Sequence, residues 1–209
     1  MTNKEWGFST LELFVGVAVI SIVASIALPQ AFNSINYYRL HRDASQVAGY
    51  LNVERMRAAS QGAPYALDVN ASNYAIEQLT PLPYDPLGTP STITYTSQSP
   101  AVYDFGTQYL APGDTVTNCR PSGVSVYPTP VIGDPSTCGT PFQIYFNTRG
   151  LPVDVHGSAL SSTGGVAVYL MSTNPSTNTI SMIDAVTVSA GGAVQVWNWS
   201  PSTSAWALR

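Results

Sequence analysis

The chain begins with a short leader, MTNKEWG, and then becomes almost wholly apolar. From Leu13 to Tyr38 it contains no Asp, Glu, Lys or Arg. Because about 20 apolar residues at about 1.5 Å of rise each cross the hydrocarbon core of a bilayer, this pattern predicts a membrane-spanning helix over residues 8–28. One acid, Glu12, lies near the start of the run. A carboxylate in such a segment is costly, so Glu12 is a candidate functional residue.

A helical period continues beyond Pro29. Apolar residues recur at helical spacings and form one stripe, which predicts an amphipathic helix. Gly62 and Pro64 then stop it. We therefore expect one helix over 8–61, with a kink at Pro29, which lacks a backbone N–H. The stripe consists of Tyr37, Leu40, Ala44, Val47, Leu51 and Ala58, and the opposite face is expected to carry Arg42, Asp43, Gln46, Glu54 and Arg57.

From Tyr65 onward the period changes to two, which is typical of strands with one buried face. Short links such as Asn70-Ala71-Ser72 and Gly191-Gly192 join neighbouring strands as hairpins. The predicted fold class is α+β: a long helix whose second half packs on an antiparallel head, residues 62–209, built of two small sheets. The expected strands are Tyr65–Val69, Asn73–Gln78, Thr92–Thr96, Val102–Phe105, Val124–Tyr127, Phe142–Phe146, Val166–Met171, Ile180–Ser189 and Val194–Trp199.

The leader differs from an ordinary secretory signal, in which the small residue at the cleavage site follows the apolar core. Here Gly7 precedes that core, so cleavage after Gly7 would leave the apolar helix in the mature protein. Cleavage would also create an amine on Phe8, four positions before Glu12 and on the same helix face. That amine and the Glu12 carboxylate would neutralise each other, within one chain or between neighbours. The alternative is a plain signal anchor whose Glu12 reaches the membrane interface, which gives Gly7-Phe8 no role.

Residues 1–30 resemble the class III signal of type IV pilins and type II secretion pseudopilins, on the basis of Gly7, Phe8, Glu12 and Pro29. The resemblance implies that a prepilin peptidase removes residues 1–7 and N-methylates Phe8. It also implies that Phe8 and Glu12 guide assembly and that Pro29 kinks the helix. The implied partners are this peptidase, the inner membrane and other pilins in a filament.

Residues 42–70 resemble the GspH/FimT/FimU branch of that family, whose helix carries an L...AR.eAi-like motif before a first strand. Leu51, Glu54-Arg55-Met56 and Ala58-Ala59 match it approximately. Phe142–Gly150 and the closing hairpin from Val186 to Trp197 resemble later elements of the same branch. This implies a minor pilin or pseudopilin that is incorporated into, or primes, a type IV pilus or a type II secretion pseudopilus. The alternatives are a major pilin and a DNA-binding pilin in DNA uptake. The expected location is the inner membrane, as a single-pass protein, and then a periplasmic or cell-surface filament.

Only 10% of the 209 residues are charged, and the chain is rich in turn-forming residues, which suits an extracytoplasmic head. Two cysteines in an exported chain, Cys119 and Cys138, predict a disulfide that closes a loop. Two free thiols are the alternative. A metal site is less favoured, because the loop has no histidine and CxxC is absent. Acids within the Asp85–Asp134 segment leave calcium binding open.

The charge pattern disfavours nucleic acid as a partner. Beyond Ala58 the chain has only three basic residues, Arg120, Arg149 and Arg209, against eight acids. Binding to the phosphates of nucleic acid needs an excess of basic over acidic residues.

We expect neither enzymatic activity nor a cofactor. His41, on the helix, reads as a solvated surface residue, and His156 lies in a turn-like stretch; no common catalytic motif occurs. Three tryptophans near the C-terminus, Trp197, Trp199 and Trp206, indicate either core packing or a protein interface.

Overall fold

A computed structural model describes residues 10–71, 73–81, 95–97, 108–110, 114–136, 138–154, 157–160, 164–174 and 179–209. Two compact units divide the chain: one ends at Tyr38, and the other comprises Arg39–Arg209.

A single long helix, α1 (Thr10–Gln61), forms the N-terminal part of the described chain. It includes Pro29 without interruption, and the predicted kink there stays a prediction. The helix ends where the sequence places its end, because Gly62 takes a φ of 63° in the left-handed region and Pro64 cannot continue the helical hydrogen bonds.

Sheet 1 follows the helix and is antiparallel throughout its described pairings. Its strand order is β3-β2-β1-β6-β7, and β4 pairs with β2 beside that path. The strands are β1 (Tyr65–Val69), β2 (Asn73–Pro81), β3 (Tyr95–Ser97), β4 (Gln108–Tyr109), β6 (Phe142–Phe146) and β7 (Pro152–Val153).

Sheet 2 is also antiparallel and has the strand order β11-β10-β9-β8-β5. A tight turn at Gly191-Gly192 connects β9 to β10, as the sequence predicts. The strands are β5 (Asp114–Thr117), β8 (Gly165–Asn174), β9 (Thr179–Ser189), β10 (Val194–Ser200) and β11 (Ala205–Leu208).

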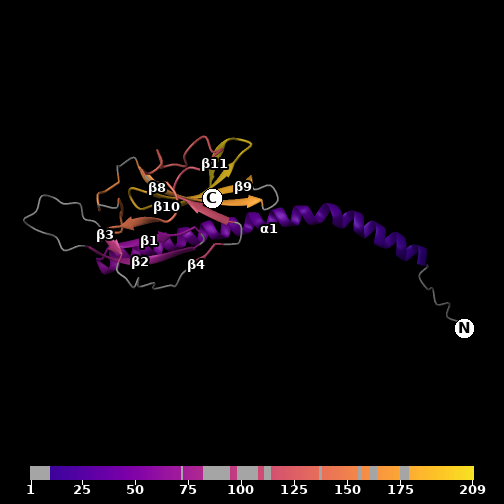
Figure 1. The fold of residues 1–209 in the computed structure, drawn as a ribbon, viewed down its shortest axis with the longest axis horizontal. Coiled ribbons are helices and arrows are strands. Elements are labelled where there is room, and N and C mark those ends of the chain that lie inside the picture. The colour runs from indigo at the N-terminus through magenta and orange to yellow at the C-terminus, as the bar shows by residue number, and fades with distance from the viewer. Residues whose placement is uncertain are drawn as a thin grey trace, which may run out of the picture. The chain divides into compact units, whose positions relative to one another are not determined.

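One hydrophobic core joins the second half of α1 to both sheets (Figure 1). The predicted stripe provides the helix side of this core: Leu40, Ala44, Val47, Leu51 and Ala58 are all buried. Alternate residues of β1, β6, β8 and β9 provide the sheet side. The predicted α+β fold, with the helix packed on two antiparallel sheets, is therefore confirmed.

A second apolar layer covers the opposite face of sheet 2. Tyr169 and Ala185 on that face pack with Val131 from the loop between the two cysteines. Val124, from the same loop, packs with Trp199 and Ile183. Sheet 2 thus lies between α1 on one face and the cysteine loop on the other.

The structure differs from the expected strands at several places. Val124–Tyr127 is not a strand, because Val124 is anchored in the outer layer and Pro121 and Pro128, at either side, have no N–H for a ladder. Four short strands were not expected, namely β4, β5, β7 and β11. Val102–Phe105 lies outside the described residues.

Candidate functional site

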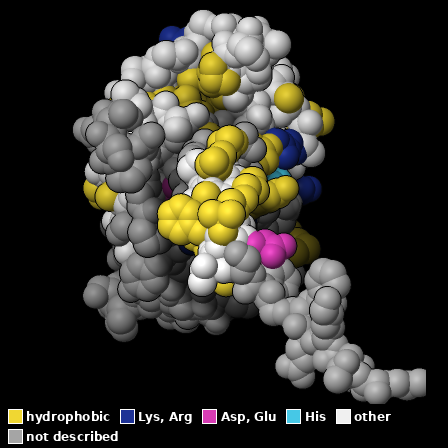
Figure 2. Space-filling model, turned by 90° about the vertical axis from the view of Figure 1, so that its right-hand side faces the viewer, with side chains coloured by type: hydrophobic (Ala, Val, Ile, Leu, Met, Phe, Trp, Pro, Cys, Tyr) yellow, Lys and Arg dark blue, Asp and Glu magenta, His cyan; other side chains and the backbone are white. Residues whose placement is uncertain are grey.

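The first part of α1 is an apolar helix with no cover in the described structure. Its window Thr10–Ala27 is long and apolar enough to cross a membrane, and none of it is buried. Phe14 is 76% exposed, and the neighbouring Leu, Ile and Val side chains are exposed on every side. In Figure 2, apolar side chains (yellow) gather near the centre of the face that is turned to the viewer. Soluble monomers rarely expose so large an apolar surface, and by length and composition this helix could cross a membrane.

Polar groups within this span are few, and their positions suit an apolar surrounding. The hydroxyls of Ser21 and Ser25 donate hydrogen bonds to the carbonyl oxygens of Val17 (2.8 Å) and Ile22 (2.7 Å) in the same helix. Such back-bonding satisfies a hydroxyl without water. Glu12 lies in the first turn, where the positive end of the helix dipole favours a carboxylate.

The predicted processing residues Gly7 and Phe8 lie outside the described residues. Cleavage between them, methylation of Phe8 and the pairing of its amine with Glu12 therefore remain predictions. So does the division into leader, helix and head.

The second part of α1 meets sheet 2 through polar groups at Arg39–Asp43. His41 is half-buried, and its Nδ1 lies 3.3 Å from Oδ2 of Asp184 on β9. Asn198 on β10 donates a 2.8 Å hydrogen bond to the other Asp184 oxygen. His41 was expected to be a solvated surface residue; that expectation is wrong because sheet 2 folds over this turn and brings a buried acid to it.

A further acid, Asp114 of β5, lies in the same region. Burial raises the pKa of Asp114 from its ordinary 3.8 to about 6, although a hydrogen bond from the Ser172 side chain opposes the rise. The charge of Asp43 raises the same pKa, and the charges of Arg39 and Arg42 lower it. Asp43 was expected on the exposed face of α1, but it is 1% exposed, and its Oδ1 accepts a 2.9 Å hydrogen bond from Arg42.

Glu54 departs from the sequence prediction in the same way. It was placed on the polar face of α1, yet it is fully buried, and neither carboxyl oxygen has a hydrogen-bond partner among the described residues. Burial therefore raises the pKa of Glu54 well above its ordinary value; the Leu67 backbone lies near the carboxyl and favours a lower pKa, but it is the smaller influence and does not form one of the hydrogen bonds of this structure. The helical period could not show this, because sheet 1 and sheet 2 together cover more of the helix than one apolar stripe.

The cysteine loop is closed by the predicted disulfide, Cys119–Cys138. Asp134 organises its interior: one carboxyl oxygen accepts the Arg120 backbone N–H at 2.7 Å and the other accepts the Tyr127 hydroxyl at 3.0 Å. The Arg120 guanidinium lies over the Tyr127 ring at 4.5 Å. These contacts link Arg120, Tyr127 and Asp134 across the loop.

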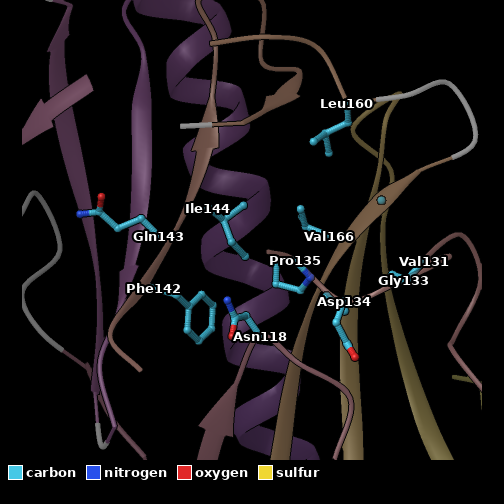
Figure 3. Close-up of a pocket in the computed structure, with 12 residues that line it drawn as sticks. Asn118, Val131, Gly133, Asp134, Pro135, Phe142, Gln143, Ile144, Leu160 and Val166 are labelled. Carbon is cyan, nitrogen blue, oxygen red and sulfur yellow. The ribbon is translucent and has the colours of Figure 1, made fainter. Parts of the chain in front are cut away.

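A cavity of about 250 Å³ lies between β6, β8 and the cysteine loop (Figure 3). Phe142, Ile144 and Val166 form part of its apolar wall. Its acid, Asp134, is engaged by the loop's own hydrogen bonds. Among the described residues, no three of His, Cys, Asp or Glu come together as a cation site. His156 lies outside the described residues.

The C-terminal tryptophans serve packing in this structure. Trp199 is buried, and its ring centroid lies 5.3 Å from that of Trp206. The indole N–H groups of Trp197 and Trp206 donate to Thr187 Oγ1 (2.9 Å) and to the Val126 carbonyl oxygen (2.8 Å). Of the two interpretations of this tryptophan cluster, core packing is the one that fits, because the indole rings pack the cysteine loop against sheet 2.

The described residues form a long helix, apolar and uncovered in its first part, whose second part packs on two antiparallel sheets. A solved structure with a similar layout is that of the minor pseudopilin EpsH from the type 2 secretion system of Vibrio cholerae. It is 11% identical to this chain, the match covers 76% of this chain and 95% of that one, and the TM-score is 0.42. No protein-family model and no curated protein sequence matches the chain. At that identity and TM-score, the likeness assigns no function.

Proposed function

We propose that this chain is a minor pilin or pseudopilin, which is held in the inner membrane and then built into, or primes, a type IV pilus or a type II secretion pseudopilus. The observation that carries the proposal is the difference in exposure between the two parts of α1. Its first part exposes apolar side chains on every side, whereas its second part buries one face in the core of the head.

A subunit of this kind needs that arrangement. The apolar span stores the chain in the bilayer, and the same surface later packs against the spans of neighbouring subunits. Because the span and the core helix are one continuous element, α1, the folded head is carried with the helix when it leaves the membrane.

Processing completes the proposal. A prepilin peptidase would cut between Gly7 and Phe8 and methylate Phe8, and the new amine would pair with Glu12 of the same or a neighbouring chain. The carboxylate in the first turn of an otherwise uncharged span supports this role. The role is structural, so we expect no turnover of a substrate.

The charge distribution favours filament assembly over DNA uptake as the main role. The head is acidic. Arg55 of α1 donates to the Gly192 carbonyl oxygen, and Arg120 of the head donates to that of Ser125, so both guanidinium groups are engaged in contacts within the chain.

The direct test is the intact mass of the chain after extraction from membranes that contain a prepilin peptidase. We expect loss of residues 1–7 and addition of one methyl group to the Phe8 amine. Gly7→Val should block both changes, whereas Gly16→Ala should not, because Gly16 lies within α1 and nothing is within 4 Å of a Cβ added there. A mature chain that keeps Met1 would contradict the proposal.

A further inference from the structure

The helix turn Arg39–Asp43 meets sheet 2 through polar groups, in contrast to the apolar core around Leu51 and Ala58. Asp114, Ser172 and Asp184 each stand two residues from a core residue of the same strand, namely Val116, Leu170 and Val186. Side chains two apart on a strand share a face. All three polar residues therefore belong to the face of sheet 2 that packs on α1.

The charged and titratable groups around Asp114 come from every element packed there. The helix provides Arg39, His41, Arg42 and Asp43. From sheet 2 come Ser172 of β8, directly opposite Asp114 in the ladder, Asp184 of β9, and Asn198 of β10, which bonds Asp184.

The atom Oδ2 of Asp114 is buried and has no hydrogen-bond partner among the described residues. An ionised carboxylate with one orphaned oxygen, facing the buried acid Asp43, weakens the contact between helix and sheet. A neutral carboxyl removes that repulsion.

We propose that this junction is a pH-sensitive latch: a proton on Asp114 tightens the docking of Arg39–Asp43 onto sheet 2, and loss of that proton loosens it. The latch regulates how firmly sheet 2 holds the helix turn Arg39–Asp43, and it goes beyond the filament role because it operates in the isolated subunit.

The direction follows from proton linkage. The pKa of Asp114 is about 6 when the turn is docked, above its ordinary 3.8. The stabilisation from the bound proton is therefore complete below pH 3.8 and is lost as the pH rises through about 6. Between pH 5 and 7.5, local opening of the turn should increase by roughly fivefold to tenfold for a shift of this size.

The test is hydrogen exchange by mass spectrometry on the full chain in detergent micelles, corrected for the intrinsic pH dependence of exchange. In the wild type, peptides over Arg39–Ala48 should lose protection between pH 5 and pH 7.5, while peptides over Leu51–Gln61 should not. Asp114→Asn should keep the turn protected at both pH values. Asp68→Asn, an acid of β1 in sheet 1, is the matched control and should behave as the wild type.

Two further variants keep the test decisive. Arg39→Gln removes an exposed cation that lowers the pKa of Asp114, so the midpoint should move to higher pH. His41→Gln should retain the response. If the response survives in Asp114→Asn and disappears in His41→Gln, it belongs to the His41–Asp184 pair and the proposal is wrong. A wild type without any change at this turn also overturns it.

Discussion

The guanidinium of Arg55 donates a hydrogen bond from Nη1 to the carbonyl oxygen of Gly192, 2.8 Å away. Gly192 lies in the β9–β10 turn of sheet 2. Gly150, in the β6–β7 turn of sheet 1, reaches the same residue, since a Cβ on Gly150 would lie 2.6 Å from the Arg55 carbonyl oxygen. One helical residue therefore contacts a turn from each sheet.

Substitution of Gly150 should be strongly destabilising. Gly150→Ala places a side chain at a φ of 70° and against the backbone oxygen of Arg55, so we expect a loss of about 3 kcal/mol in the free energy of unfolding. Gly123→Ala is the matched control: its φ is 89°, but nothing lies within 4 Å, so strain alone should cost about 1–2 kcal/mol. Urea unfolding followed by tryptophan fluorescence measures both. Equal losses would mean that the close approach at Arg55 relaxes freely.

Replacement of Glu54 should change how stability depends on pH. Because burial raises the pKa of Glu54, its bound proton stabilises the folded state at low pH, and this stabilisation is lost as the pH rises through the raised pKa. Glu54→Gln should match the wild type at pH 5 and exceed its melting temperature at pH 9. Glu54→Leu should gain about 1–3 kcal/mol by removing the unpartnered polar group. A Gln variant that is weaker at every pH would show that the carboxyl has a partner in solution.

Loss of the disulfide should loosen the outer layer of sheet 2 before the core. The double variant Cys119→Ser/Cys138→Ser should lose about 3 kcal/mol of stability, a typical value for a loop of this length. Trp206 should then become more exposed, because the loop that accepts its indole hydrogen bond at Val126 is less constrained. Reductant should lower the melting temperature of the wild type and leave that of the double variant unchanged. If reductant also lowers the melting temperature of the double variant, its effect does not come from this disulfide.

The strongly periodic parts of the sequence predicted the fold well. The α1 stripe, the β1–β2 hairpin, β6 and the β9–β10 hairpin all rest on local signals, either a regular apolar period or a short run of turn-forming residues. Short strands such as β5 and β7 have no such signal. They exist because a longer neighbour, β8 or β6, offers a ladder edge, and that is a tertiary effect.

The features of the candidate site could be predicted only where they depend on residues close together in the sequence. Glu12 stands out because its neighbours are apolar, and the cysteine pair is visible by count alone. The buried positions of Asp43 and Glu54 depend on two sheets that cover α1 from different sides, so a single helical stripe could not reveal them. His41 likewise depends on Asp184, a residue 143 positions away in sequence.

Removal of the Glu12 carboxylate should impair assembly and not folding. Glu12 lies in an exposed helix outside the core of the head, so Glu12→Ala should leave the melting temperature of the head unchanged. If the carboxylate pairs with a Phe8 amine in an apolar bundle, its loss should reduce incorporation into filaments by about tenfold or more, which corresponds to about 1.4 kcal/mol.

The measurement is the ratio of this chain in sheared filaments to that in the membrane fraction, with Glu12→Asp as the matched control that keeps the charge. Glu12→Asp should retain more incorporation than Glu12→Ala or Glu12→Gln, because a shorter carboxylate still provides the partner charge. Normal incorporation of Glu12→Ala would mean that Glu12 is a tolerated acid at the membrane interface. Assembly would then be set by the apolar surface of α1 alone.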